Sequence, residues 1–139
     1  MCCATAGVSA LGAKGAAVAT RVLLVEDESL IRMILAEALA DEGFEVLEAA
    51  SGDEAAHVAE GAGFDLLLTD IQMPGRLDGV ALARHLLQSR PDLPVVYVTG
   101  RPESLDRVER RDRAAYVRKP YSPNEVIAVV RGLLGADGA

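Results

Sequence analysis

Acidic, hydroxyl and ammonium side chains stand at the ends of short apolar runs in this chain of 139 residues. Glu26 and Asp27 follow the first run, Asp70 ends the third, Thr99 ends the fourth and Lys119 follows the fifth. Carboxylate oxygens are ligands that hard divalent cations prefer, and a carboxylate can also attack a phosphoryl group. A hydroxyl and an ammonium group can hold the remaining phosphoryl oxygens. The set therefore indicates magnesium-dependent phosphoryl chemistry.

The carboxylates of Glu26, Asp27 and Asp70 would lie close together if the first and third runs form neighbouring strands, about 4.8 Å apart. Three carboxylates at that spacing repel one another unless a cation lies among them. An octahedral Mg²⁺ bound by one or two carboxylates keeps water positions that phosphoryl oxygens can take. Lys119 is one of two lysines beside 12 arginines, and a compact ammonium suits a crowded phosphoryl site better than a guanidinium does.

Each of these residues also has an ordinary structural explanation when it is considered alone. Acidic residues at 26–28 suit the first turn of a helix, where the helix dipole favours negative charge. Asp70 suits a turn after a strand, Thr99 suits a strand, and a proline after Lys119 suits a strand end. The joint arrangement at the ends of separate strands is what favours a phosphoryl site.

Five apolar, β-branched runs recur about 20 to 30 residues apart and are typical of strands, at 22–25, 46–47, 66–68, 95–98 and 116–117. Apolar residues at helical spacing fill the gaps, most clearly over 31–39 and 126–134. Ser51 and Ser122 suit helix N-caps, and a weak apolar pattern indicates a loosely packed helix over 101–111. Five strand and helix units predict a doubly wound α/β domain, with helices on both faces of a parallel sheet.

The composition is that of one globular domain. The chain is 50% hydrophobic and 25% charged, and its first 20 residues are too short and too weakly apolar to span a bilayer. Cys2 and Cys3 are adjacent, which excludes a disulfide framework and indicates a reducing, cytoplasmic setting. We expect a disordered leader over 1–20, a domain over 21–135 and a tail over 136–139.

The net charge of −7 is unevenly distributed along the chain. Residues 21–75 carry −11 and residues 76–139 carry +3, with Lys14 as the remaining charge. This balance is unlike that of a general nucleic-acid binder, which concentrates lysine and arginine. Residues 101–119 hold seven bases, including Arg107, Arg110 and Arg111, and four acids. Such a stretch is either a solvated helix with paired opposite charges or a face that meets an acidic partner.

The chain resembles the receiver domains of the two-component response-regulator family over residues 21–134. The motifs that carry the resemblance are Val25-Glu26-Asp27-Glu28, Asp70-Ile71-Gln72-Met73-Pro74-Gly75, Asp78-Gly79, Val98-Thr99-Gly100 and Tyr116-Val117-Arg118-Lys119-Pro120. The resemblance implies a flavodoxin-like sheet with five strands in the order 2-1-3-4-5. It also implies that Asp70 accepts a phosphoryl group from the phosphohistidine of a sensor kinase or phosphotransfer protein.

The resemblance also implies roles for the residues around Asp70. Mg²⁺ would be held by the carboxylates of Glu26, Asp27 and Asp70 and by the main-chain carbonyl of Gln72. Lys119 would pair with the phosphoryl group, Thr99 would move to bond it, and Tyr116 would turn inward as Thr99 moves. The Lys119-Pro120 peptide bond would be cis.

The family's mode of action implies a signalling protein that catalyses only its own phosphorylation and dephosphorylation. The phosphorylated form would engage a protein target through the face made of the fourth helix, the fifth strand and the fifth helix. A phosphorelay intermediate, which passes the phosphoryl group on to a phosphotransfer histidine, is the alternative within the family. No binding to a membrane or to nucleic acid is expected.

Two departures from the commonest family pattern stand beside the site. Gly75-Arg76-Leu77 makes the loop between Pro74 and Asp78 one residue longer. Gly100 takes the place of a small side chain that often gates the site, and so leaves the site open. The longer loop and the Thr-Gly pair resemble stand-alone, single-domain regulators of alphaproteobacteria.

Other functions fit the sequence less well. A haloacid dehalogenase-type phosphatase also uses an aspartate after an apolar strand, but it needs a second carboxylate two residues later, where this chain has Gln72. A flavin carrier needs an uncharged phosphate loop after the first strand, and a P-loop nucleotidase needs a Gly-Lys-Ser/Thr motif. His57 and His85 lie without partners at ligand spacing and are predicted to be surface residues.

Overall fold

The apolar runs form five parallel strands in the computed structural model, which describes residues 19–108 and 113–138. The strands are β1 (Arg21–Val25), β2 (Glu45–Ala49), β3 (Leu66–Asp70), β4 (Val95–Thr99) and β5 (Ala114–Arg118). The helices are α1 (Ser29–Asp41), α2 (Gly52–Gly61), α3 (Gly79–Ser89), the 3₁₀ helix η1 (Pro102–Arg107) and α4 (Pro123–Gly138). None of these described helices has the length and apolar composition needed to cross a lipid bilayer.

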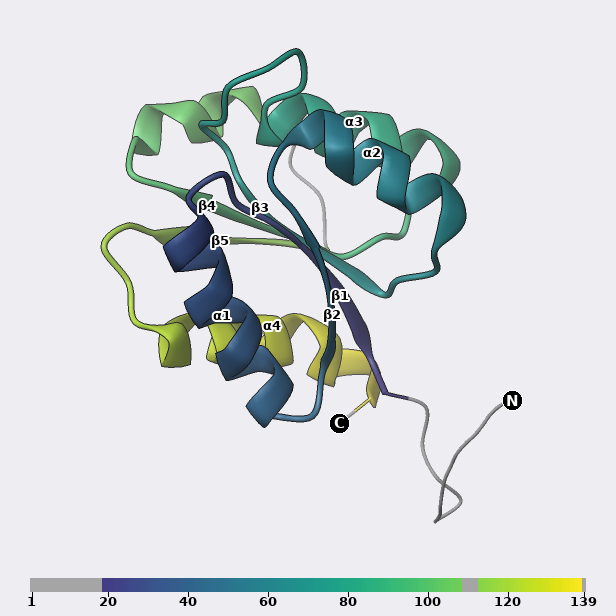
Figure 1. Ribbon diagram of the computed structural model, residues 1–139, viewed down its shortest axis with the longest axis vertical. Coiled ribbons are helices and arrows are strands. Elements are labelled where there is room, and N and C mark those ends of the chain that lie inside the picture. Colours follow the sequence, from purple (N-terminus) through teal and green to yellow (C-terminus); the bar gives the residue numbers. More distant parts are fainter. Residues whose placement is uncertain (1–18, 109–112, 139) are drawn as a thin grey trace.

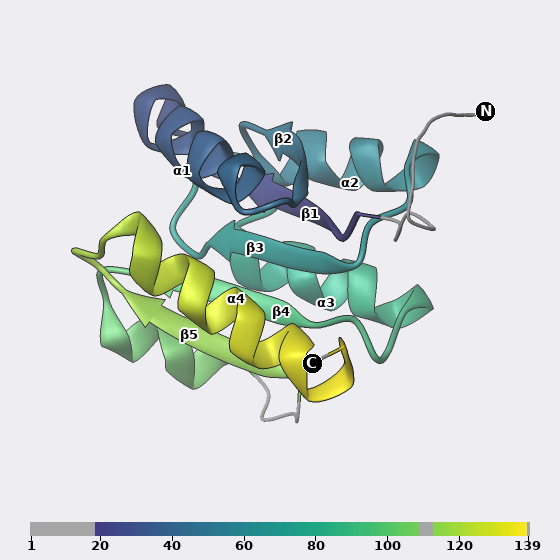
Figure 2. The ribbon, with the colours of Figure 1, turned by 90° about the horizontal axis from the view of Figure 1, so that it is seen from below.

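The strand order is β2-β1-β3-β4-β5, which confirms the predicted doubly wound topology. Helices α2 and α3 cover one face of the sheet, and α1 and α4 cover the other (Figures 1 and 2). Alternate strand residues enter the two cores: Leu23 and Leu67 pack toward α2 and α3, whereas Leu24 and Leu68 pack toward α1 and α4. The central strands β3 and β4 are buried along their whole length, as expected for a parallel sheet covered on both faces.

The predicted helix caps are confirmed. Ser51 Oγ accepts a hydrogen bond from the Glu54 main-chain N–H at 3.0 Å. Ser122 Oγ accepts one from the Glu125 N–H, and the Glu125 carboxylate accepts one in return from the Ser122 N–H. These reciprocal contacts form a capping box, which satisfies donors that a helix leaves free at its start.

The fourth helix differs from the prediction. Over residues 101–108, the described part of the predicted helix, the structure has the six-residue 3₁₀ helix η1, in which no residue is buried. Pro102 starts it, and Leu105 and Val108 are the partly buried apolar residues that pack on the core nearby. These two residues offer too little apolar surface to hold a longer helix against the sheet. Arg110 and Arg111 lie outside the described residues.

The other boundaries differ less. Helix α4 continues to Gly138, so residues 136–138 of the predicted tail are helical. Residues 1–18 of the predicted leader, with Cys2, Cys3 and Lys14, lie outside the described part of the chain. In α1, Ile34 belongs to the predicted core stripe but is 45% exposed, because the sheet and α4 cover only part of that stripe.

Candidate functional site

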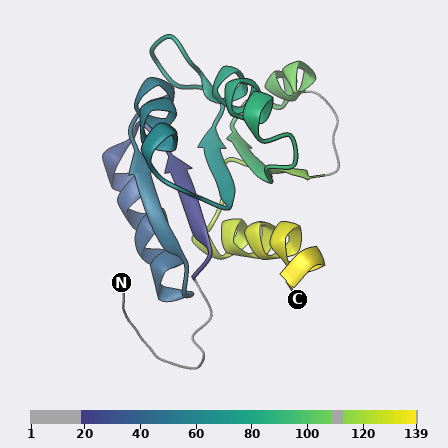
Figure 3. The same ribbon diagram turned by 90° about the vertical axis from the view of Figure 1, so that its right-hand side faces the viewer.

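The five strands are parallel, so their carboxyl ends lie at one edge of the sheet, and the residues singled out in the sequence end or follow these strands. Figure 3 shows the sheet from the side, with helices on both of its faces. Opposite residues Val25 and Thr69 align β1 with β3, so that Glu26 and Asp70 follow at neighbouring strand ends. One carboxylate oxygen from each of Glu26, Asp27 and Asp70 lies within 4.8 Å of the others. Glu26 and Asp70 are buried and Asp27 is exposed, so the cluster opens to solvent on the Asp27 side.

Both oxygens of Asp70 are held by the chain. Lys119 Nζ donates to Asp70 Oδ2 at 2.6 Å, and the Gln72 main-chain N–H donates to Oδ1 at 3.1 Å. Burial lowers the pKa of the Lys119 ammonium, but the hydrogen bond and charge of Asp70 outweigh it, so that the pKa is raised overall. Lys119 therefore stays protonated and neutralises part of the acidic cluster. The Lys119-Pro120 bond is cis, as predicted.

Glu26 has an unusually high proton affinity for a glutamate. Burial, and to a smaller degree the charge of Asp70, raises its pKa to about 7, although the Glu28 N–H and Lys119 act in the opposite direction. Glu26 Oε2 accepts from the Glu28 N–H at 3.0 Å. The Arg32 side chain fixes the same turn, because it donates to the Glu26 main-chain carbonyl at 2.7 Å and pairs with Glu48.

These residues fit a hard divalent cation. The cluster offers only oxygen ligands, two of them buried and one facing solvent, which suits a cation that keeps several waters. Burial is the main cause of the raised pKa of Glu26 and the charge of Asp70 adds to it; a positive charge among the three carboxylates would favour their ionised form. The main-chain carbonyl of Gln72 as a fourth ligand remains a prediction.

The Thr99 hydroxyl makes its hydrogen bonds to groups other than Asp70. Thr99 Oγ1 lies 2.9 Å from Gln72 Oε1 and 3.1 Å from the Arg101 carbonyl, and it accepts from the Arg101 N–H at 2.9 Å. The other end of the Gln72 carboxamide, Nε2, donates to Ser104 Oγ of η1. This use of the Gln72 side chain could not be predicted from the sequence, because the three residues meet only through the fold.

Tyr116 faces outward in this structure. It is 42% exposed, and its ring stacks on buried Tyr97 with the centroids 5.8 Å apart and the planes at 18°. Tyr97 and Tyr116 lie opposite each other on β4 and β5, so the stack follows from the strand register. The inward turn predicted for Tyr116 remains a prediction.

The longer loop after β3 rests on the start of α2. Gly75 has φ of +104°, a conformation that glycine adopts readily. A Cβ added at Gly52 would lie 2.2 Å from the Leu77 carbonyl oxygen, so the loop approaches α2 as closely as a glycine permits. A Cβ added at Gly100 would, in contrast, meet the Lys119 side chain at 3.8 Å, an ordinary contact distance, and the open access predicted for Gly100 remains a prediction.

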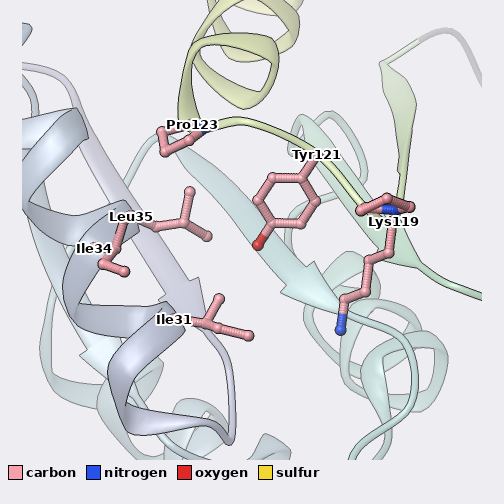
Figure 4. Close-up of a pocket in the computed structure, with 7 residues that line it drawn as sticks. Ile31, Ile34, Leu35, Lys119, Tyr121 and Pro123 are labelled. Atoms are coloured by element: carbon pink, nitrogen blue, oxygen red, sulfur yellow. The ribbon is translucent and has the colours of Figure 1, made fainter.

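An apolar pocket of about 580 Å³ adjoins the carboxylates on the α1 side (Figure 4). It is lined by Ile31, Ile34, Leu35, Lys119, Pro120, Tyr121 and Pro123. The Tyr121 hydroxyl points toward α1 and, among the described residues, has no hydrogen-bond partner although it is buried. Burial, with smaller contributions from the charges of Glu26, Asp70 and Glu28, raises the pKa of Tyr121 to about 12. The sequence analysis did not identify this pocket.

The two histidines lie apart from the site. His57 and His85 are both exposed, on α2 and α3. His57 Nδ1 is 4.0 Å from Glu60 of the same helix. Their predicted surface location is confirmed.

Comparisons with known proteins agree with this geometry. A model of the response regulator receiver domain matches residues 22–131. The transcriptional regulatory protein PdtaR of Mycobacterium tuberculosis is 44% identical over 118 residues, which cover 83% of this chain and 57% of PdtaR. The chain spans about half the length of the curated relatives it matches.

Solved structures agree as well. A response regulator receiver protein from Sinorhizobium medicae has a TM-score of 0.78 and 30% identity, covering 85% of this chain and 96% of its own. The response regulator TrrA from Thermotoga maritima, solved in complex with Mg²⁺ and BeF, has a TM-score of 0.71 and 30% identity, covering 83% of this chain and 99% of its own.

Proposed function

Because this chain belongs to the family of response-regulator receiver domains, we propose that Asp70 accepts a phosphoryl group from the phosphohistidine of a sensor kinase or phosphotransfer protein. The observation that carries the proposal is the 2.6 Å contact between Lys119 Nζ and Asp70, beside the carboxylates of Glu26 and Asp27. Gln72 stands where a phosphatase of the haloacid dehalogenase type would need a carboxylate, and the family match does not favour that alternative.

The transfer uses groups that lie around Asp70. A carboxylate oxygen of Asp70 forms a bond to phosphorus while the bond from phosphorus to the imidazole nitrogen breaks, and the imidazole keeps that electron pair. Lys119 neutralises charge on the phosphoryl oxygens, and the Thr99 hydroxyl donates to one of them after leaving its present partners. The chain thus catalyses its own phosphorylation and dephosphorylation and no further reaction.

We propose Mg²⁺ as the cofactor, held by Glu26, Asp27, Asp70 and the Gln72 main-chain carbonyl. Bound Mg²⁺ would supply positive charge that lets the carboxylates and a phosphoryl group lie together. Mg²⁺ should raise the melting temperature of the wild-type chain and not that of Asp27→Ala, while Glu37→Ala, an exposed acid on α1, should respond like wild type. Without metal, Asp27→Ala should melt at a higher temperature than wild type, because one of three repelling charges is gone. A lower melting temperature would contradict a repulsive cluster.

The phosphorylated form is proposed to act by binding another protein in the cytoplasm. Thr99 and Tyr116 would change position together, and the face made of η1, β5 and α4 would engage the target. The described bases there include Arg101, Arg107 and Arg118, which suit an acidic partner, and the net charge of −7 disfavours nucleic acid. Transfer from Asp70 to a phosphotransfer histidine would identify a relay intermediate instead.

Acetyl phosphate with Mg²⁺ tests the central proposal. Intact-mass measurement of the full chain should show one added phosphoryl group on the wild type and none on Asp70→Asn. Asp92→Asn, an exposed acid outside the site, serves as the matched control and should be labelled like wild type. Equal labelling of Asp70→Asn would overturn the assignment.

A further inference from the structure

The Gln72 carboxamide lies between the hydroxyls of two residues that are far from it in sequence. Its Oε1 is 2.9 Å from Thr99 Oγ1 at the end of β4, and its Nε2 donates to Ser104 Oγ in η1. Gln72 and Ser104 are half-buried and Thr99 is buried. One side chain thus joins the loop after β3 to both the strand end and the 3₁₀ helix.

The hydrogen-bonding capacity of the Thr99 hydroxyl is already used in this arrangement. A hydroxyl has one proton to donate, and here the two acceptors within reach are Gln72 Oε1 at 2.9 Å and the Arg101 carbonyl at 3.1 Å. Its lone pair accepts from the Arg101 N–H. To donate to a phosphoryl oxygen on Asp70, Thr99 must first give up its bond to Gln72.

Helix η1 makes few polar contacts with the rest of the fold besides the hydrogen bond between Ser104 and Gln72. It buries none of its residues, and three polar contacts are described between it and the rest of the fold. Ser104 contacts Gln72, the Arg107 side chain pairs with Asp78 at 2.8 Å, and the Arg107 carbonyl accepts from Arg84 of α3 at 3.4 Å. Release of Thr99 leaves one end of the Gln72 carboxamide without its partner. The other end is attached to η1, so a movement of the Gln72 side chain acts on that helix.

We propose that Gln72 is a positioning residue that holds the Thr99 hydroxyl away from Asp70 and transmits its release to η1 through Ser104. The inference rests on the proposed phosphorylation of Asp70 and adds to it a route from the switch threonine to η1. Ser104 anchors the carboxamide, so loss of that anchor weakens the hold of Gln72 on Thr99.

The test uses the full chain, Mg²⁺ and beryllofluoride as a mimic of the phosphoryl group, followed through the main-chain amide signals of Thr99 and Gly100. Ser104→Ala should reach half-saturation at about one fifth of the beryllofluoride concentration that wild type needs, the size expected for one neutral hydrogen bond. Ser104→Thr, which keeps a hydroxyl, should behave like wild type, and so should Asp106→Ala on the exposed side of η1.

A double-mutant cycle isolates the contact from other effects of Ser104. In a Gln72→Ala background, Ser104→Ala should change half-saturation less than twofold. In the wild type, beryllofluoride should also shift the amide signals of residues 103–106, and these shifts should shrink in Ser104→Ala while those of Thr99 remain.

An undiminished effect of Ser104→Ala in the Gln72→Ala background would overturn the inference, as would undiminished shifts at 103–106 in Ser104→Ala. Either result would leave phosphorylation of Asp70 intact. Failure of the wild-type chain to bind beryllofluoride would instead contradict the proposed function, and the inference with it.

Discussion

The carboxylates of Glu26, Asp27 and Asp70 lie between two walls of different chemistry. The apolar wall comes from α1 and the segment after β5, and consists of Ile31, Ile34, Leu35, Tyr121 and Pro123. The polar wall comes from the loop after β3 and from η1, and consists of Gln72, Asp78, Ser104 and Arg107. Lys119 takes part in both environments: its side chain lines the apolar pocket, and its ammonium contacts Asp70.

The two walls differ in how strongly they orient the side chains that contact them. Apolar contacts are non-directional, so the apolar wall contacts the Lys119 side chain without fixing an orientation. Hydrogen bonds depend on angle and distance, so the polar wall fixes the Gln72 carboxamide and, through it, the Thr99 hydroxyl. If Asp70 is phosphorylated as proposed, control of the Thr99 hydroxyl lies on the polar side of the site.

The largest expected effect comes from removing the Lys119 ammonium while keeping the apolar part of its side chain. Lys119→Met keeps an apolar stem against the pocket and removes the ammonium from Asp70. The initial rate of labelling by acetyl phosphate should fall at least ~100-fold, because a fixed group that neutralises transferred charge is gone. Lys119→Arg should recover little of that rate, since the guanidinium is larger and planar. Arg118→Met, an exposed neighbour, is the control, and labelling of Lys119→Met within a few-fold of wild type would contradict this role.

The next effect concerns the carboxylates between the walls. Burial raises the pKa of Glu26 to about 7 in the folded chain, above its ordinary 4.5. Between these pH values the folded state keeps a proton that the unfolded state has lost, so the free energy of unfolding should fall as pH rises through this window. Without metal, urea denaturation should show a loss of about 2–3 kcal/mol from this group. Glu26→Gln should flatten the profile, whereas Glu37→Gln should leave it unchanged.

Saturating Mg²⁺ provides a second check of the same group. A cation favours the ionised carboxylates, so the fall in the free energy of unfolding between pH 5 and pH 8 should shrink or reverse. A wild-type profile that is steep with and without Mg²⁺ would show that another group causes the pH dependence.

A smaller effect tests the polar wall. Asp78 Oδ1 caps α3 by accepting from the Ala81 N–H at 2.9 Å, while Oδ2 pairs with Arg107. Burial acts to raise the pKa of Asp78, but its hydrogen bonds from Ala81 and Arg107 lower it overall. Asp78→Ala should cost about 1–2 kcal/mol of stability in urea denaturation. Asp78→Asn keeps a capping oxygen and should cost less than about 1 kcal/mol, and equal losses would show that the cap is not the main contribution.

The smallest effect tests the apolar wall. Tyr121→Phe removes a buried hydroxyl that has no partner among the described residues, so stability should stay the same or rise by up to about 1 kcal/mol. Leu35→Ala, on the same wall and 2% exposed, should instead cost about 2–5 kcal/mol. A clear loss of stability in Tyr121→Phe would show that the hydroxyl is bonded in solution.

The sequence allowed the sheet and the edge that holds the site to be predicted, because strand runs and their polar ends repeat at regular distances. Glu26, Asp27, Asp70, Thr99 and Lys119 could be placed together, since parallel strands end at one edge. The length of η1 could not be predicted, because Leu105 and Val108 fit a helix as well as a 3₁₀ turn until their packing is known.

Side-chain partners across loops were harder still to predict. Gln72 and Ser104 are 32 residues apart, and no periodicity of the sequence relates them. Ile34 lies in the helical apolar pattern over 31–39 that predicts a buried face, but helical spacing does not report how far a sheet extends beneath a helix. Contacts between residues far apart in the sequence, and the burial of a helix face against a sheet, could be seen only in the folded structure.

The close approach of the Leu77 carbonyl to Gly52 has a consequence for loop exchange between receivers. The loop that contains Gly75, Arg76 and Leu77 occupies the space that a side chain at position 52 would need. Transplanting this loop into a receiver with a larger residue there would force the backbone apart. Loop length and the first residue of α2 therefore form one transferable unit, and a chimaera should carry both or neither.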